Sequence, residues 1–177
     1  MVLILANNRT VISAGAGAVL SALVVTQTLP VIDQWEGNVP IPYKDIVGVL
    51  TVCRGHTGPD VVVKGVYSPE QCDQLTKKDI NIAISGVLKV SPHLLWHPMQ
   101  LVAATSLSFN VGTGTYATSS VAREFNLGNF QAGCEALKLY KFAGGKISQG
   151  LVNRRQHEYE VCISTLTVGE FKKVKQQ

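Results

Sequence analysis

The sequence predicts an α+β fold, in which a small antiparallel β-sheet is followed by a mainly helical lobe. Apolar, β-branched runs separated by turn residues are confined to residues 46–66, and helical patterns dominate from Ser68 onward. An uncharged, apolar segment precedes both regions. At 177 residues, the chain is long enough to bury one hydrophobic core of ordinary size.

The first element is the uncharged stretch from Thr10 to Ile32, which includes the apolar residues 11–29. As a helix this stretch would be roughly 34 Å long, enough to cross a bilayer core of about 30 Å. Arg9 precedes it and Asp33 follows it, which favours a cytoplasmic N-terminus. Small and polar side chains within the stretch weaken its hold on lipid.

Four interpretations of this segment are open: a cleaved signal peptide, a permanent anchor, a weak anchor that leaves the membrane uncleaved, or a buried helix of a cytosolic protein. Small residues at 14–18 offer cleavage sites, but the strongest apolar residues come after them. A cleavage site should follow the apolar core of a signal peptide, so this position counts against cleavage.

The next elements are a short helix over residues 31–36 and a chain break at the two prolines of residues 38–42. Strands are expected over residues 46–52 and 61–66, joined by the turn-rich residues 54–59. Together these patterns predict a hairpin or a three-stranded sheet.

A long helix is expected to begin at Ser68, which can cap it, with Pro69 at the first helical position and Gln71 closing a capping box. Its pattern runs to about residue 90. Further helices are expected over residues 98–109, 119–125, 130–140 and 150–164, with a flexible loop at 143–146. The apolar helix over 98–109 should be the centre of the core.

Four cysteines lie far apart in the chain: Cys53, Cys72, Cys134 and Cys162. Zinc ligands usually come in close pairs, so neither a metal nor another cofactor is expected. An even count after an export-like segment favours two disulfides in an oxidising compartment. Three pairings are possible and the sequence does not choose among them, although the pairs nearest in sequence, 53–72 and 134–162, are favoured.

The formal net charge is +4, and most basic residues are scattered. Such a charge suits an anionic polymer, either nucleic acid or the bacterial cell wall. There is no basic stripe with interleaved aromatic residues, so nucleic-acid binding is not expected.

Glu36, Asp45 and Thr51 are the candidate catalytic residues, with eight residues between the first two and five between the last two. Glycosidic cleavage needs two carboxyl groups flanking the scissile bond, in different environments. The acid must hold its proton near neutral pH, so we expect a partly apolar surround such as Trp35 to raise its pKa. On spacing alone, solvated loop charges are the default explanation.

The whole segment resembles the phage-type lysozymes (glycoside hydrolase family 24), whose signature is a Glu, eight residues, an Asp or Cys, five residues and a Thr. The match continues in the Gly55-His56 pair, in residues 109–112, and in residues 150–158, which fit a Gly-Leu-x-x-Arg-Arg-x-x-Glu pattern. It covers about residues 33–162. Cys53 departs from it, because many relatives have Gly there.

This resemblance implies a lysozyme-like fold with the active-site cleft between sheet and helical lobe. The implied activity is that of an N-acetylmuramidase, which hydrolyses the β-1,4 bond between N-acetylmuramic acid and N-acetylglucosamine in peptidoglycan with inversion. Glu36 would be the general acid. Asp45 would stabilise charge or activate water, and Thr51 would orient that water.

Other residues receive less defined roles from the resemblance. The implied substrate contacts are Thr57, Phe109 and Ser120, although Phe109 also suits a core position. His56 is expected to be a structural hydrogen-bonding residue rather than a base. Arg154 and Arg155 either pair with the region of Glu36 or are surface charges.

With its first residues included, the chain resembles the signal-anchor-release endolysins of lambdoid phages. This implies a signal-anchor-release segment over residues 1–32 and a catalytic domain over residues 33–177. Residues 11–29 would hold the enzyme in the host inner membrane until it is released, as a monomer, to the periplasm. Position 45 is Asp and no cysteine precedes Cys53, so control is expected to be conformational. Release would let residues 31–36 refold and the freed helix pack on the domain.

Other functions remain alternatives. A lytic transglycosylase would use one acidic residue and form an anhydro product, and Asp45 and Thr51 argue against it. A non-catalytic wall-binding protein tethered to the membrane fits the apolar segment and the net charge. A membrane-disrupting helical protein fits the apolar segment alone.

Overall fold

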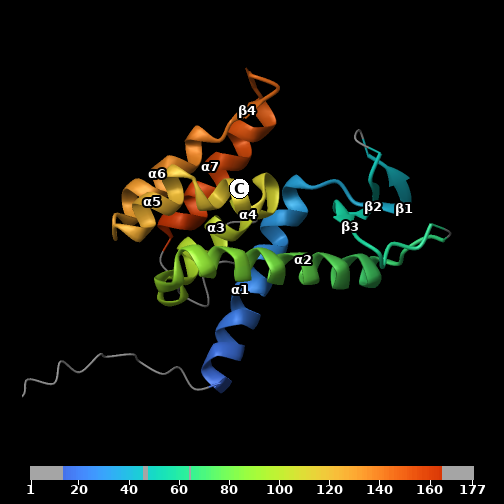
Figure 1. The fold of residues 1–177 in the computed structure, drawn as a ribbon, viewed down its shortest axis with the longest axis horizontal. Coiled ribbons are helices and arrows are strands. Elements are labelled where there is room, and N and C mark those ends of the chain that lie inside the picture. Colours follow the sequence, from blue (N-terminus) through green and yellow to red (C-terminus); the bar gives the residue numbers. More distant parts are fainter. Residues whose placement is uncertain (1–13, 46–47, 64, 165–177) are drawn as a thin grey trace, which may run out of the picture.

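The computed structural model describes residues 14–45, 48–63 and 65–164. It places a small three-stranded sheet on one side and a group of helices on the other, with the long helix α2 (Pro69–Val90) running between them (Figure 1). A second, two-stranded sheet lies within the helical lobe. The α+β prediction is confirmed.

Helix α1 spans Ala14–Trp35 without a break and contains Pro30. Residues 31–35 are therefore helical, as expected, but they are the end of this long helix and not a short helix of their own. Proline inside a helix removes one backbone hydrogen bond. The apolar stripe nevertheless continues past it, because Val24, Val31 and Ile32 are all buried at helical spacing, and α1 packs against α2 and α3. This packing offsets the cost of the proline.

The N-terminal part of α1 extends beyond α2 (Figure 1). Residues 11–13 of the apolar stretch lie outside the described residues. None of the helices in the described part of the chain is long and apolar enough to cross a membrane.

The three-stranded sheet has the order β1 (Val39–Lys44), β2 (Leu50–Cys53), β3 (His56–Thr57), and both pairings are antiparallel. The chain break expected at residues 38–42 was wrong, because both prolines lie in β1. This strand is at the edge of the sheet, where proline is tolerated because part of its backbone needs no partner.

The strand expected over residues 61–66 was also wrong, since its described residues form no strand. The backbone N–H of Val62 donates to the hydroxyl of Tyr67 at 2.8 Å, and Val63 and Val66 are exposed. Of the strand expected over 46–52, residues 46 and 47 lie outside the described residues, and β2 begins at Leu50. Before it, Gly48 N donates to the carbonyl of Asp45 at 2.9 Å.

Helix α2 begins as predicted, with Ser68 as N-cap, Pro69 at its start and a complete capping box with Gln71. The helical lobe that follows contains η1 (Pro92–Trp96), α3 (Pro98–Val111), α4 (Thr113–Ala117), α5 (Ser120–Asn126), α6 (Phe130–Ala136), η2 (Leu137–Leu139) and α7 (Gln149–Ile163). The expected loop at 143–146 belongs to a hairpin of β4 (Phe142–Ala143) and β5 (Lys146–Ile147). Helix α3 is the centre of the core, as predicted, and residues 101–108 are all buried.

Two disulfides join the elements, Cys53–Cys72 and Cys134–Cys162. These are the pairs nearest in sequence, so the favoured pairing is confirmed. The first ties the end of β2 to the first turn of α2, and the second ties α6 to α7.

Candidate active site

Asp45 and Thr51 lie on the hairpin formed by β1 and β2. Thr51 pairs with Tyr43 across the sheet. The Asp45 carboxylate accepts a hydrogen bond from Val49 N at 2.8 Å, and the Thr51 hydroxyl donates to Val49 O at 3.1 Å. The backbone of Val49 therefore contacts both side chains, which joins these two predicted residues in one unit of the hairpin.

Glu36 directly follows α1, and its backbone N–H donates to Ile32 O at 2.9 Å, which continues the helical pattern. Its carboxylate accepts a hydrogen bond from Arg154 Nη1 at 2.6 Å. The Arg154 side chain is only 4% exposed, whereas that of Glu36 is 25% exposed. The acid is thus anchored from the protein interior and still reachable from solvent.

Trp35, the last residue of α1, also contacts α7. Its indole N–H donates to His157 Nδ1 at 3.0 Å, and the two ring centroids are 6.0 Å apart. Burial lowers the pKa of His157 from its usual value, which favours the neutral ring that can accept this bond. The last turn of α1 is therefore attached to α7 by Trp35 and by Glu36.

Behind Arg154 lies a buried polar cluster on α7. Glu158 has no exposed surface; its carboxylate is 3.1 Å from Arg154 Nε and accepts a hydrogen bond from Ser106 Oγ at 2.6 Å. Arg155 Nε lies 3.2 Å from the other oxygen of Glu158, and Arg155 Nη2 donates to Asn110 Oδ1 at 2.9 Å. Burial raises the pKa of Glu158, while the arginines and Ser106 oppose that rise.

The two arginines are buried, so their interpretation as surface charges is wrong. Arg154 pairs with Glu36 itself. Arg155 contacts Glu158 and Asn110 instead. Sequence reasoning gave no role to Glu158, although its positions four residues after Arg154 and three after Arg155 are those of side-chain pairs on one helix face.

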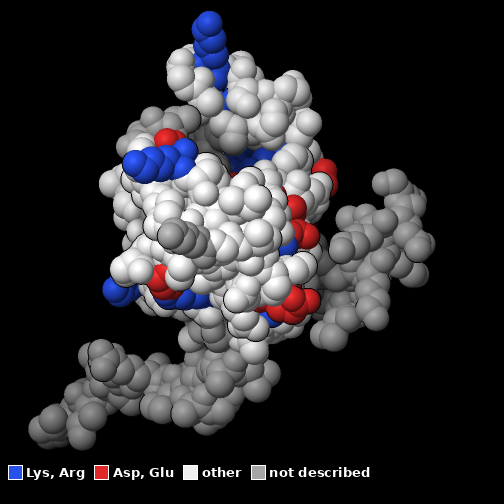
Figure 2. All heavy atoms as spheres, turned by 90° about the vertical axis from the view of Figure 1, so that its right-hand side faces the viewer, with Lys and Arg blue, Asp and Glu red and all other residues white. Residues whose placement is uncertain are grey.

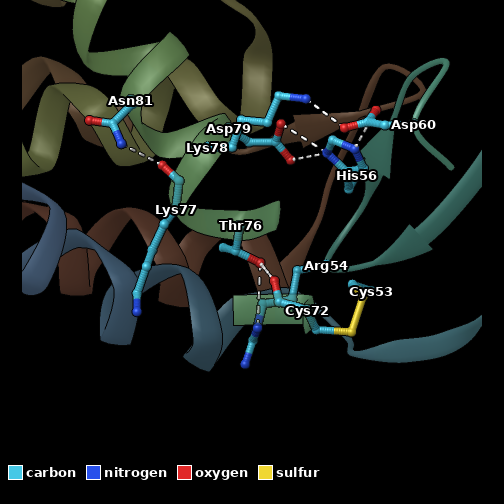
Figure 3. Close-up of polar contacts among 10 residues, drawn as sticks. All are labelled: Cys53, Arg54, His56, Asp60, Cys72, Thr76, Lys77, Lys78, Asp79 and Asn81. Carbon is cyan, nitrogen blue, oxygen red and sulfur yellow. Dashed lines mark hydrogen bonds and ion pairs between the residues drawn. A yellow bond between two sulfur atoms is a disulfide. The ribbon is translucent and has the colours of Figure 1, made fainter. Parts of the chain in front are cut away.

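His56 is buried and both its ring nitrogens contact carboxylates (Figure 3). Nδ1 lies 2.8 Å from Asp79 and Nε2 lies 3.2 Å from Asp60, and Asp60 also pairs with Lys78 at 2.5 Å. The bonds from Lys78 and His56 lower the pKa of Asp60 to about 2. His56 thus joins β3 to the following loop and to α2, which is the geometry expected of a structural hydrogen-bonding residue.

A pocket of about 220 Å³ lies where β3, α2, α3 and α4 meet, and Thr57 and Phe109 both line it. The structure therefore brings together two of the three predicted substrate contacts. Ser120 is not in the pocket lining; its backbone N–H donates to the hydroxyl of Tyr140 at 3.1 Å. A larger groove of about 710 Å³ runs along α2 and α4 and shares Ile82 and Thr113 with the pocket.

Figure 2 views the molecule from the side that carries the sheet and shows basic and acidic side chains interspersed over that face. Within the described residues, no group of three or more His, Cys, Asp or Glu side chains could hold a metal ion.

The chain is similar to several phage proteins of known family. The phage lysozyme family matches residues 33–158. The SAR-endolysin of Enterobacteria phage PA-2 is 39% identical over 153 residues, and that of Enterobacteria phage P21 is 37% identical over 151 residues. Each alignment covers 84% of this chain and 90% of the relative.

Among solved structures, the active form of the P1 phage endolysin Lyz has the same fold, with a TM-score of 0.68 at 23% identity, covering 84% of this chain and 93% of that one. The lysozyme-like fold and the predicted resemblance are thus confirmed. The chain belongs to the phage lysozyme family and is a lytic enzyme of the endolysin type.

Proposed function

We propose that the protein is an N-acetylmuramidase that hydrolyses the β-1,4 bond between N-acetylmuramic acid and N-acetylglucosamine in peptidoglycan. The observation that most supports this is the arrangement of two separately held carboxyl groups. Glu36 is held by Arg154 at the end of α1, and Asp45 is held beside Thr51 on the hairpin that follows. Hydrolysis with inversion needs such a pair, with space between them for a water molecule.

In this mechanism Glu36 donates its proton to the oxygen of the leaving sugar. Asp45 activates the attacking water or stabilises the positive charge that develops on the sugar ring. The Thr51 hydroxyl already donates to Val49 O, so its oxygen is left to accept a hydrogen from the water. Thr51 therefore directs the lone pair of the water toward the anomeric carbon.

The remaining proposed roles concern substrate binding and support. Thr57 and Phe109 bind the sugar chain in their shared pocket, and Ser120 makes a contact outside it. His56 keeps the strand that carries Thr57 in place through Asp79.

We further propose that the enzyme is controlled by its N-terminal segment, as the name SAR-endolysin of its relatives suggests. Residues 11–29 would anchor it in the host inner membrane before release of the monomer to the periplasm. Val24 and Val25 are buried against the domain, and they cannot lie in lipid at the same time. Because Glu36 continues α1, docking of this helix places the acid.

The chemistry is tested with outer-membrane-permeabilised Gram-negative cells and with purified peptidoglycan. We expect wild-type protein to clear the cells and Glu36→Gln to leave them turbid while folding normally. The products should carry reducing ends, and proton NMR should show the α-anomer first. Anhydro ends would instead identify a lytic transglycosylase. Undiminished lysis by Glu36→Gln would rule out the proposed catalytic acid.

A further inference from the structure

Arg54 lies one residue beyond β2, and its side chain is only 9% exposed although it is charged. It contacts two helices that are distant in sequence. On α1, its Nε donates to Asp33 Oδ1 at 2.7 Å. On α2, its Nη1 lies 2.9 Å from Asp73 Oδ1 and 3.4 Å from Thr76 Oγ1. One guanidinium group therefore joins the sheet to α1 and α2.

The Cys53–Cys72 disulfide fixes the α2 side of this contact. Arg54 directly follows Cys53 and Asp73 directly follows Cys72, so the covalent bond brings the two charged residues together. Cys53 has a φ of 56°, a backbone conformation that residues other than Gly rarely adopt. Figure 3 shows the Arg54 side chain extending from this point toward Thr76.

Thr76 is itself oriented to accept, because its hydroxyl donates to Cys72 O at 2.8 Å. The contacts of Arg54 Nη1 are thus with α2 and do not involve α1. The other edge, Nε and Nη2, faces Asp33. A guanidinium group is planar and rigid, so fixing one edge also fixes the direction of the other.

Through Asp33, this second edge is connected to the helix turn that precedes Glu36. Asp33 lies three residues before Glu36, in the last turn of α1, and Thr51 lies three residues before Arg54. The ion pair between Arg54 and Asp33 therefore joins the turn that carries the acid to the strand that carries the water-orienting hydroxyl. On its other side, the same turn is attached to α7 through Trp35 and Glu36.

We infer that Arg54 is a positioning residue, which fixes the distance between the acid and the Asp45–Thr51 unit through Asp33. The Cys53–Cys72 disulfide contributes to this positioning, because it sets the orientation of Arg54 toward Asp73. This inference rests on the proposed function. Inverting hydrolysis requires a defined gap between the carboxyl groups, and a displacement of about 1 Å can slow a reaction by about 100-fold. Docking of α1 completes the contact, so Arg54 also responds to the position of that helix.

The first test compares Asp33→Asn, Arg54→Gln and the double variant in the full-length protein on purified peptidoglycan. The Asp33 side chain is 55% exposed, so its replacement leaves the fold intact. We expect kcat to fall roughly tenfold in each single variant, with KM changed by less than about twofold. The double variant should be no slower than Arg54→Gln, because both changes remove one interaction.

The outcomes that decide this test are as follows. Wild-type kcat in Asp33→Asn overturns the inference, and so does a loss in the double variant equal to the product of the single losses. Arg54→Lys should recover only part of kcat, because an ammonium group cannot present two fixed edges. Glu36→Gln is run in parallel, and lysis by that variant would reject the proposed function whatever the Arg54 variants do.

The second test uses the two disulfides as a matched pair, with loops of 19 and 28 residues. Cys53→Ser/Cys72→Ser and Cys134→Ser/Cys162→Ser should both lower Tm by similar amounts, because loop length changes the entropy of the unfolded chain only slowly. At temperatures below the unfolding transitions of both variants, only Cys53→Ser/Cys72→Ser should have a lower kcat than the wild type. Equal losses of kcat, or none in the first variant, would overturn the role of the disulfide. If the first variant does not fold, Asp33→Asn still decides the role of Arg54.

Discussion

In the helical lobe, α3 is buried along residues 101–108 and is surrounded by apolar side chains of α1, α2 and α7, whereas the core cluster beside the sheet contains Val52, Cys53, Val61 and Cys72. The helical lobe is thus held mainly by apolar packing, apart from the buried polar cluster of Arg154, Arg155 and Glu158 on α7. The region around the sheet is held by a disulfide and by Arg54 and His56 with their carboxylate partners.

The difference matters because Asp45 and Thr51 lie on the sparsely packed side. Apolar packing is non-directional and adjusts to small changes, while a bidentate ion pair or a hydrogen bond sets a distance and an angle. The proposed catalytic geometry therefore depends on a few polar contacts, and global stability depends on α3 and its neighbours. Substitutions and a truncation can test this separation.

Deletion of residues 1–29 should have the largest effect on stability. It removes Val24, Val25 and Thr28 from the core, and the loss of the apolar burial alone is worth about 4 kcal/mol. We expect a lower free energy of unfolding in urea and no lysis, because Glu36 loses the helix that places it. A truncated protein that is stable and fully lytic would show that α1 is dispensable to the folded enzyme.

Arg154→Ala should destabilise the protein by about 3–5 kcal/mol, because it leaves the buried Glu158 with one cationic partner fewer. Activity should also be lost, since Glu36 is no longer held. Replacing the pair together, as Arg154→Met with Glu158→Gln, should restore part of the stability measured in urea but not the lysis. Recovery of lysis in that double variant would contradict the anchoring role of Arg154.

The features that could be predicted from the sequence depend on residues close to one another in the chain. The capping box of α2 is complete within four residues, and the proposed catalytic triplet is recognisable by its spacing together with the Gly55-His56 pair that follows it. The strand β1 was missed because its prolines are tolerated only at the edge of a sheet, a position that local sequence does not encode. The contacts of Arg54 join residues 21 and 19 positions apart, and that of Glu36 with Arg154 joins residues 118 apart. No local pattern distinguishes such partners from other charges.

Two core truncations compare the regions directly. Leu107→Ala in α3 should cost about 3 kcal/mol, and Val52→Ala in β2 about 2 kcal/mol. Both side chains have no exposed surface. The kcat per folded molecule should nevertheless fall only for Val52→Ala, because Val52 lies between Thr51 and Cys53. Thermal unfolding measures the loss of stability, and initial rates at temperatures well below both transitions measure kcat. A larger loss of kcat in Leu107→Ala than in Val52→Ala would contradict the proposed difference between the two regions.

The smallest expected effect is a pH dependence of the loop that carries Asp60. The pKa of Asp60 is lowered to about 2, mainly by the bond from Lys78 and then by that from His56. A lowered pKa in the folded state stabilises the protein fully above the unfolded value, about 3.9, and this stabilisation disappears as the pH falls through about 2. The gap in Tm between wild type and Asp60→Asn should therefore close between those pH values. In Lys78→Gln the gap in Tm should close at a higher pH, because this substitution removes the main cause of the lowered Asp60 pKa. A gap in Tm that does not change with pH would show that these bonds do not tie the loop to α2.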